Sequence, residues 1–414
     1  MELYLKNVGK IQETTIALDG ITVIAGENNT GKSTVSRAIF SVLNSYSNVD
    51  ERMKEERKHS LQRALSPLLR AHPPAIRGKV IQELTEHMDA YRENPELIRA
   101  YLMELAESAK RSPSLQETGI DRAAAMVSDC LNVSREEIFH ASLEKNLNAE
   151  FNGQIQNIYT KEASQIELRL EDKTISVDLQ DGHIIKNSDL LESGLSAVYL
   201  DNPMILDEGR VYWFSLYHGM DHLEHLRSCL FSEEKQSTLI EEIVASKKLN
   251  RIYEMISKVC SGDFIKKDGE FGYREKAGGE ALNIGNLSDG LKTFVILKTL
   301  LLKGFIEPGS VILLDEPEIH LHPEWQLLLA EIIVLLHKEF DLYVLLNTHS
   351  HYFLDAIEVY SKKHGVSNAC QYYLSSMDGE FAVIENVTGN TEKIYKKLAS
   401  PLQQLENERY HDED

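Results

Sequence analysis

The N-terminal part of the chain has the apolar pattern of β-strands followed by a helix. Leu3 and Leu5 alternate with polar residues, and residues 15–18 and 21–25 form two more strand-like segments joined by the turn sequence Asp19-Gly20. Beyond residue 31 the apolar spacing becomes three to four residues, which is typical of an amphipathic helix. The residues with this spacing are Val35, Ile39, Val42 and Leu43. The pattern predicts a strand that leads through a short loop into a helix.

The segment from residue 46 to residue 148 has a different pattern. Charged residues are frequent, and helical spacing recurs, for example at Ile98, Leu102 and Leu105. Prolines interrupt it, so we expect several short helices rather than one long coiled coil. We predict an α-helical insertion over residues 46–148. It is either a structural lobe or the carrier of specificity, as surface insertions on a shared core often are.

From residue 149 onward strand signals return and then alternate with helices. Residues 155–185 alternate like antiparallel strands, residues 197–200 form a buried strand, and residues 263–284 indicate a hairpin region. From residue 288 the order is helix, strand, helix, strand, which a parallel sheet flanked by helices requires. We therefore predict an α/β fold with a parallel-core sheet and an antiparallel β subdomain. Residues 1–45 and 149–414 are expected to form this one discontinuous domain.

Composition constrains the partners and the compartment. The chain has 414 residues and a formal net charge of −21, and a strongly acidic surface repels the DNA backbone. Broad nonspecific DNA binding is not expected, although a local basic patch could still hold DNA. The sequence has neither a long apolar run nor a signal-peptide pattern, so we expect no membrane span. The 4 cysteines form no CxxC pair, which favours a reducing cytoplasm.

One glycine-rich segment lies between the predicted strand and the predicted helix. Gly26 and Gly31 frame four residues and are followed by Lys32 and Ser33, which is the spacing and context of a phosphate-binding loop. Its glycines let backbone N–H groups face phosphates, and the helix N-terminus favours negative charge. Lys32 is expected to reach the β- and γ-phosphates of ATP, and the Ser33 hydroxyl to ligate Mg²⁺. The predicted nucleotide-binding residues of this loop are Gly26, Glu27, Asn28, Asn29, Thr30, Gly31, Lys32, Ser33 and Thr34.

A second segment ends a buried strand with two acids. Residues 311–314 are an apolar run that fits a parallel strand, and Asp315 and Glu316 follow it. Ligands bind at the carboxyl ends of strands in such sheets. We expect Asp315 to hold Mg²⁺ and Glu316 to act as the catalytic base or to position the attacking water. The alternative is a solvated acidic pair without a ligand.

A third segment resembles a motif that is typical of one class of ATPase. Leu287-Ser288-Asp289-Gly290-Leu291-Lys292 precedes an apolar helix, with Ser288 at a natural N-cap position and Gly290 permitting close backbone approach. It resembles the Leu-Ser-Gly-Gly signature of ATP-binding-cassette (ABC) ATPases, although a Ser-x-Gly turn before a helix is common. The resemblance implies that Ser288 and Gly290 contact the γ-phosphate of a nucleotide on the opposite subunit, so that a homodimer encloses two ATP molecules.

Histidines add to the resemblance. His349 follows the last predicted strand, at the place of the switch histidine that senses the γ-phosphate in this superfamily. His320 and His322 lie in a loop that resembles the one crossing the dimer interface; a zinc site at this pair would lack an evident third ligand.

A further trio, His218, His222 and His225, falls on one helix face. It could bind a metal. We expect an exposed, solvated face instead, because glycine and acidic residues neighbour it.

The opening Leu5-Lys6-Asn7-Val8-Gly9-Lys10-Ile11 and the loop sequence Glu27-Asn28-Asn29 resemble the chromosome-maintenance (SMC), RecF and overcoming-lysogenization-defect (OLD) branch of these ATPases. The resemblance covers roughly residues 1–45 and 150–390. The insertion is too short for a long coiled coil, and we find no Toprim nuclease pattern. The glutamine that contacts Mg²⁺ in this branch has two candidates, Gln154 and Gln156, which could equally belong to a surface loop.

The resemblance implies an ATPase subunit of a bacterial anti-phage defence complex, which restrains a separate nuclease or toxin effector. The alternative is a repair or recombination ATPase that clamps DNA across its dimer; a transporter subunit fits the N-terminal pattern poorly. The expected state is a homodimer or a higher homo-oligomer in the cytoplasm.

Overall fold

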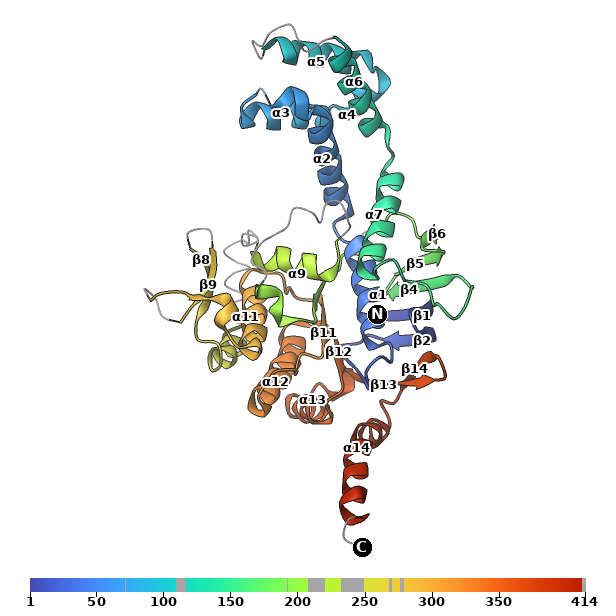
Figure 1. Ribbon diagram of the computed structural model, residues 1–414, viewed down its shortest axis with the longest axis vertical. Helices are drawn as coiled ribbons and strands as arrows, with labels where there is room; N and C mark the ends of the chain where they lie inside the picture. Colours follow the sequence, from blue (N-terminus) through green and yellow to red (C-terminus); the bar gives the residue numbers. More distant parts are fainter. Residues whose placement is uncertain are drawn as a thin grey trace. The chain divides into compact units, whose positions relative to one another are not determined.

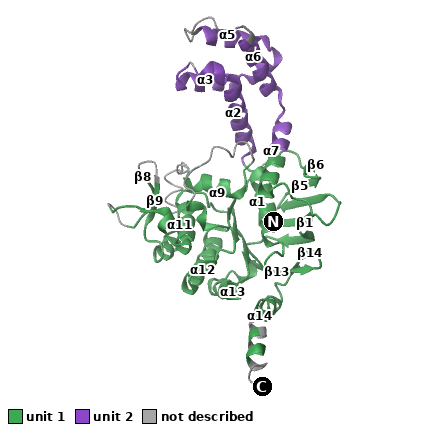
Figure 2. Cartoon of the chain, in the orientation of Figure 1, with its two compact units in different colours: residues 1–47, 143–414 green, residues 48–142 purple. Residues whose placement is uncertain are grey.

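The computed structural model describes residues 1–70, 72–108, 117–191, 193–207, 220–231, 249–267, 270–275 and 279–411. The chain divides into two compact units, shown in Figure 2: residues 1–47 with 143–414, and residues 48–142. The sequence predicts the corresponding boundaries at 45/46 and 148/149.

The larger unit contains an 11-stranded sheet with the order β6-β5-β4-β1-β2-β14-β13-β3-β12-β11-β7. Five neighbouring strands pair in parallel and form the core of this sheet. They are β3 (Ile21–Gly26), β7 (Ala197–Leu200), β11 (Val311–Asp315), β12 (Tyr343–Thr348) and β13 (Cys370–Asp378). β3 and β7 are buried along their whole length, as expected for parallel strands covered on both faces.

The other strands of this sheet are mostly antiparallel. β1 pairs with β2 and β4, β4 with β5, and β5 with β6, while β14 pairs with β13 and meets β2 at one parallel bridge. They are β1 (Glu2–Val8), β2 (Ile11–Ala17), β4 (Ser164–Leu170), β5 (Lys173–Gln180), β6 (His183–Asn187) and β14 (Phe381–Asn386). A parallel core joined to an antiparallel part confirms the predicted fold class.

Helices of the larger unit alternate with the parallel strands, as the pattern from residue 288 predicts. They include α1 (Lys32–Ser45), α9 (His222–Phe231), α11 (Asp289–Leu302), α12 (Pro323–Phe340), α13 (His351–His364) and α14 (Glu392–His411), with short 3₁₀ turns η1 (Pro203–Asp207), η2 (Ile284–Asn286) and η3 (Ser367–Ala369). α12 ends at Phe340, because Asp341 takes a left-handed conformation (φ 54°) and ends the helix.

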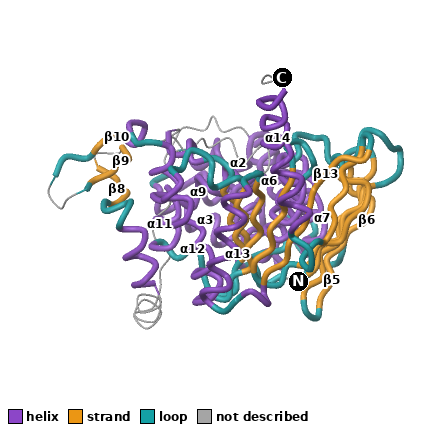
Figure 3. Tube along the Cα trace, turned by 90° about the horizontal axis from the view of Figure 1, so that it is seen from below, coloured by secondary structure: helices purple, strands orange, loops and turns teal. Residues whose placement is uncertain are grey.

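The hairpin region between residues 263 and 284 forms a separate small sheet. Its strands are β8 (Asp263–Lys267), β9 (Glu270–Arg274) and β10 (Leu282–Asn283), in the order β10-β9-β8. Figures 1 and 3 show this small sheet apart from the main one. Tyr273 anchors it, since its buried hydroxyl accepts a hydrogen bond from the Gly262 amide at 2.7 Å.

The smaller unit is helical in its described part. Its helices are α2 (Val49–Leu69), α3 (Pro74–Glu86), α4 (Met88–Glu93), α5 (Glu96–Ser108), α6 (Glu117–Asn132) and the first part of α7 (Arg135–Glu150). Leu61, Leu65, Leu102, Val127 and Leu131 are among the residues of its separate apolar core. Among the described residues of the whole chain, no helix has the length and apolar character needed to cross a membrane.

Candidate nucleotide site

The phosphate loop lies where the sequence places it, between β3 and α1. Asn29 (φ 64°) and Gly31 (φ 87°) take left-handed conformations, which allow the tight curl of the loop. Strand β13 supports the loop from the side, because the Ser375 hydroxyl donates to the Thr30 carbonyl at 2.6 Å. A Cβ on Gly26 would lie 2.1 Å from the Ser375 carbonyl oxygen, so only glycine fits at the end of β3.

Lys32 lies inside this loop and faces the acidic strand end. Its Nζ donates to the carbonyls of Gly26 at 3.1 Å and Glu27 at 2.7 Å. Burial lowers the pKa of Lys32, and the nearby negative charges, Glu316 first and then Asp315, partly oppose this effect. The structure therefore brings together the phosphate-loop lysine and the two acids that the sequence singles out.

The two acids at the end of β11 have distinct surroundings. One carboxylate oxygen of Asp315, Oδ2, accepts a hydrogen bond from the Tyr199 hydroxyl at 3.0 Å. The other, Oδ1, is buried and has no hydrogen-bond partner among the described residues. Burial raises the pKa of Tyr199 well above its usual value, and so do the charges of Asp315 and Asp201. The tyrosine therefore stays protonated and donates to the acid.

Glu316 has a strained backbone next to the switch-histidine position. Its φ is 49°, and its amide donates to the Asn347 carbonyl at 2.9 Å, which fixes the turn after β11. Non-glycine residues held in this region cost about 1 to 3 kcal/mol and are often found at functional sites. His349 Nδ1 lies 3.3 Å from Glu316 Oε1. His349, which directly follows β12, therefore lies next to the carboxylate of Glu316.

The structure also shows polar residues at this edge that sequence reasoning did not identify. Glu318 is 3% exposed and accepts a short hydrogen bond from the Thr348 hydroxyl. Burial raises the pKa of Glu318, and the bond from Thr348 acts in the opposite direction. Asn347 donates to the Ser36 hydroxyl at 2.9 Å and so links β12 to α1. Glu318, Thr348 and Asn347 lie within two residues of Glu316 or His349, and this is the only sequence signal that could have identified them.

The signature segment forms the start of α11. Ser288 occupies the N-cap position with an extended backbone (φ −66°, ψ 147°), but its side chain makes no capping bond to the described chain and is exposed. Gly290 packs against the loop after the acidic strand, since an added Cβ would lie 2.9 Å from the His320 carbonyl oxygen. Lys292 donates to Asp207 at 2.9 Å and to Asp289 at 3.1 Å, which fixes the helix start on η1.

The paired histidines lie in the loop after Glu316. His320 is exposed and has a left-handed conformation (φ 66°). His322 is the N-cap residue of α12, and its ring accepts a hydrogen bond from the Glu324 amide at 3.4 Å. Within the described ranges no cluster of three or more His, Cys, Asp or Glu residues is arranged to hold a metal ion.

One expectation about the histidine trio is wrong. His218 lies outside the described residues, but His222 is only 5% exposed rather than solvated. Its ring contacts Glu150 Oε1 and Asp201 Oδ2, each at 2.8 Å. Burial disfavours the charge on His222, yet the hydrogen bonds that its ring donates to Asp201 and Glu150 outweigh this effect and raise the pKa of His222 to about 9. His222 is therefore buried because it is paired with two acids, Glu150 and Asp201, that are distant from it in the sequence.

The two glutamine candidates lie in the turn region after α7. Gln156 faces Val8 in an isolated bridge, and its side chain donates to the Glu162 carbonyl at 2.6 Å and accepts from the Asp181 amide at 2.9 Å. Gln154 and Gln156 both line an open hollow near the β5–β6 turn. The Gln156 side chain is thus hydrogen-bonded to the two neighbouring loops that contain Glu162 and Asp181.

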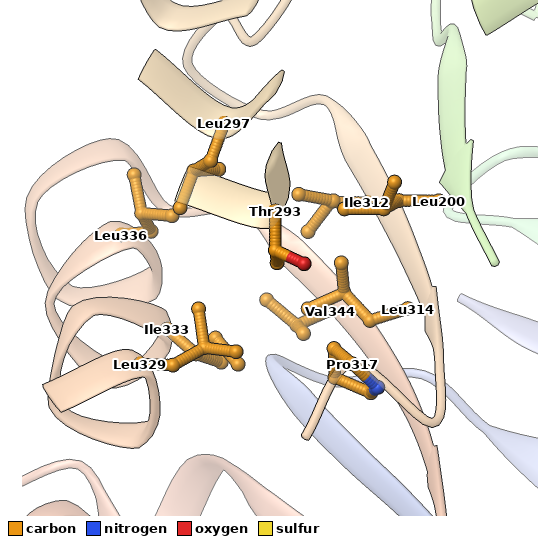
Figure 4. Close-up of a pocket in the computed structure, with 10 residues that line it drawn as sticks. All are labelled: Leu200, Thr293, Leu297, Ile312, Leu314, Pro317, Leu329, Ile333, Leu336 and Val344. Atoms are coloured by element: carbon orange, nitrogen blue, oxygen red, sulfur yellow. The ribbon is translucent and has the colours of Figure 1, made fainter. Parts of the chain in front are cut away.

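A small cavity of about 10 Å³ lies within the core of the larger unit (Figure 4). Apolar side chains of α11, α12, β11 and neighbouring elements point toward one another around it. They include Leu297, Ile312, Leu314, Leu329 and Ile333. The cavity holds no charged lining residue, so it belongs to the packed layer beneath the acidic strand end and not to the nucleotide site.

Comparison with known proteins decides the family. Residues 140–355 match the family described as "AAA domain, putative AbiEii toxin, Type IV TA system". The chain belongs to this family. The matched range contains the signature segment, Asp315, Glu316 and His349, whereas the phosphate loop precedes it. Since the matched family is described by its AAA domain, this chain is an ATPase.

Similar solved structures include an SMC head domain from Thermotoga maritima, with 13% identity, coverage of 93% of this chain and 98% of that chain, and a TM-score of 0.39. Another is an Smc head domain with an extended coiled coil from Pyrococcus furiosus, bound to the C-terminal domain of ScpA; identity is 12%, coverage 99% and 98%, and TM-score 0.40. A third is the ADP conformation of an ATP-binding cassette of an ABC transporter, with 12% identity, coverage of 97% and 96%, and a TM-score of 0.36.

Proposed function

We propose that this ATPase binds Mg²⁺ and ATP at the edge formed by the phosphate loop and the end of β11. Lys32 neutralises the β- and γ-phosphates, Glu316 accepts a proton from or positions the attacking water, and His349 contacts the γ-phosphate. The 3.3 Å approach of His349 to Glu316 supports this pairing.

The residues at this edge fit a magnesium ion. Mg²⁺ prefers oxygen ligands and usually binds through one or two side chains together with phosphate oxygens. Asp315 has a buried carboxylate oxygen, Oδ1, without a hydrogen-bond partner among the described residues. Ser33 follows Lys32 in the first turn of α1. Asp315 and Ser33 would hold the ion, which supplies positive charge to the phosphates.

We place the complete catalytic site between two copies of the chain. The observation that carries this proposal is the start of α11, where the Ser288 side chain is exposed and Gly290 packs tightly on the His320 carbonyl. A helix N-terminus with open N–H groups suits an anion. A second subunit's nucleotide would supply this anion, so that each ATP lies between one phosphate loop and the other subunit's Ser288 and Gly290.

The wider role we propose is that of a scaffold and regulator in a bacterial anti-phage defence complex, which controls a separate nuclease or toxin. The family description, which names a toxin–antitoxin system, supports this setting. The net charge of −21 favours a protein partner over nonspecific DNA.

The test is capture of partners from the native host by tagged Glu316→Gln, which should bind ATP and hydrolyse it very slowly. Lys32→Ala serves as the control that cannot form the ATP state. We expect a stoichiometric partner with a nuclease or toxin fold, identified by mass spectrometry, in the Glu316→Gln sample alone. DNA recovered without a protein partner would instead favour a DNA-clamping repair ATPase.

A further inference from the structure

A buried polar cluster joins the end of helix α7 to the acidic end of β11. Glu150, the last residue of α7, is 2% exposed, and His222 lies between it and Asp201. The His222 amide also donates to Glu150 Oε2 at 2.8 Å, so this carboxylate accepts from both the ring and the backbone at the start of α9. The three residues come from α7, α9 and the turn after β7.

Charges in this cluster are balanced. Besides the two carboxylates and the imidazole of His222, the Arg37 Nε atom of α1 lies 3.7 Å from Glu150 Oε1. A buried side chain that is hydrogen-bonded to two acids moves little, because the loss of either hydrogen bond would leave a buried charge unpaired. The His222 ring is therefore held at a fixed position.

Tyr199 connects this fixed ring to the acidic strand end. The ring centroids of Tyr199 and His222 are 4.3 Å apart with an interplanar angle of 31°, and Phe40 packs against both rings. In the β7–β11 register Tyr199 pairs with Leu313. Since alternate strand residues share a face, the Tyr199 side chain lies on the same face as Asp315, two residues further on. Its hydroxyl reaches Asp315 Oδ2 at 3.0 Å.

From this chain of contacts we infer that Tyr199 is a positioning residue for Asp315, and that His222 and Glu150 hold Tyr199 in place. The Tyr199 hydroxyl occupies one oxygen of Asp315, which leaves the other, Oδ1, without a hydrogen-bond partner among the described residues and available to the Mg²⁺ of the proposed function. Metal-ligating carboxylates are oriented by such partners. The inference rests on the proposed role of Asp315 as a Mg²⁺ ligand, and it connects Mg²⁺ binding to the end of α7.

The experiment is a titration of ATPase activity with Mg²⁺ in Tyr199→Phe, which removes only the hydroxyl. We expect the half-saturating Mg²⁺ concentration to rise by about 10-fold, with unchanged affinity for a fluorescent ATP analogue measured in EDTA. Tyr46→Phe is the matched control, because it removes another buried hydroxyl that donates to the Ser188 carbonyl at 3.1 Å. Tyr46 lies beyond the far end of α1, and its variant should titrate like the wild type.

Two further variants test the rest of the cluster. His222→Gln and Glu150→Gln should shift the Mg²⁺ titration in the same direction as Tyr199→Phe. A wild-type Mg²⁺ dependence of Tyr199→Phe would overturn the inference, and so would an equal loss of nucleotide affinity in EDTA, which indicates a purely structural effect. Asp315→Asn separates the two proposals: if it also left the Mg²⁺ dependence unchanged, the assignment of Asp315 as a ligand would be wrong.

Discussion

At the scale of single residues, the decisive feature is the carboxylate of Glu316. Its strained backbone (φ 49°) and its amide bond to the Asn347 carbonyl fix the side chain beside His349. Such strain persists only where the surrounding structure imposes it. Tyr199 and the β7 strand fix the neighbouring acid, Asp315, through a separate contact. The two acids are thus held independently, which suits two different tasks.

The first prediction concerns hydrolysis. Glu316→Gln keeps the size of the side chain but removes the proton acceptor, so we expect the turnover of ATP to fall by about 10²- to 10⁴-fold. Nucleotide affinity should stay close to that of the wild type. Single-turnover hydrolysis and equilibrium binding measure the two quantities. Turnover near the wild-type rate would show that Glu316 is not the catalytic base.

The second prediction concerns binding. Lys32→Ala removes the positive charge that lies within the phosphate loop, so the affinity for ATP should fall by at least about 10-fold, as expected from the loss of a charge-assisted contact. Isothermal titration with ATP measures it. Lys186→Ala, which removes an exposed lysine on β6, is the control and should bind like the wild type. Equal affinities of the two variants would contradict the role of Lys32.

The third prediction concerns pH. The pKa of His222 is about 9 in the folded chain, against about 6.5 in an unfolded chain. Protonated His222 therefore stabilises the fold fully below about pH 6.5, and this contribution is lost as the pH rises through 9. It amounts to about 3 kcal/mol. The melting temperature of the wild type should fall toward that of His222→Gln between these pH values. A difference in melting temperature between the two proteins that stays constant over this pH range would contradict the stabilising role of protonated His222.

At the scale of elements, the packing of α11 on the loop after β11 fixes the shape of the signature segment. The added Cβ of Gly290→Ala would lie 2.9 Å from a backbone oxygen of His320 and 3.1 Å from a Leu321 methyl. We expect the helix start or the loop to shift, at a cost of about 1 to 3 kcal/mol in stability. Chemical denaturation measures this cost.

Gly304→Ala is not a suitable control, because Gly304 has a φ of 70° and is strained by any side chain. Gly78→Ala is suitable, since nothing lies within 4 Å of its added Cβ in α3. An unchanged unfolding free energy for Gly290→Ala would show that the loop tolerates a side chain there.

The elements around the proposed nucleotide site are the predictable part of the fold, because each has a local sequence signal. An apolar run followed by two acids marks β11, and a glycine spacing marks the loop before α1. The cluster around His222 has no such signal: its acids lie 72 and 21 residues away along the chain. Only the packing of α7, α9 and β7 brings them together. The role of Tyr199 could not be predicted from the sequence either, since a tyrosine in a buried strand is also an ordinary core residue.

At the scale of the whole molecule, the proposed catalytic site requires two copies of the chain. The phosphate loop, Asp315 and Glu316 belong to one edge of the larger unit, and the exposed Ser288 lies at the start of a different helix. In the sandwich we propose, a nucleotide bound by one subunit meets Ser288 of the other. A variant that damages one of the two halves should therefore complement a variant that damages the other.

Whether two chains share the catalytic site can be measured as ATP hydrolysis by a mixture of Lys32→Ala and Ser288→Arg. Lys32→Ala should bind ATP only weakly, and the arginine of Ser288→Arg should block the sandwich while leaving ATP binding by its own loop intact. Each variant alone should be inactive. Mixed dimers pair an intact loop with an intact Ser288 at one site, so we expect that mixing restores hydrolysis and ATP-dependent dimerisation. A mixture as inactive as its components, or Ser288→Arg alone hydrolysing ATP at the wild-type rate, would contradict a site shared between two chains.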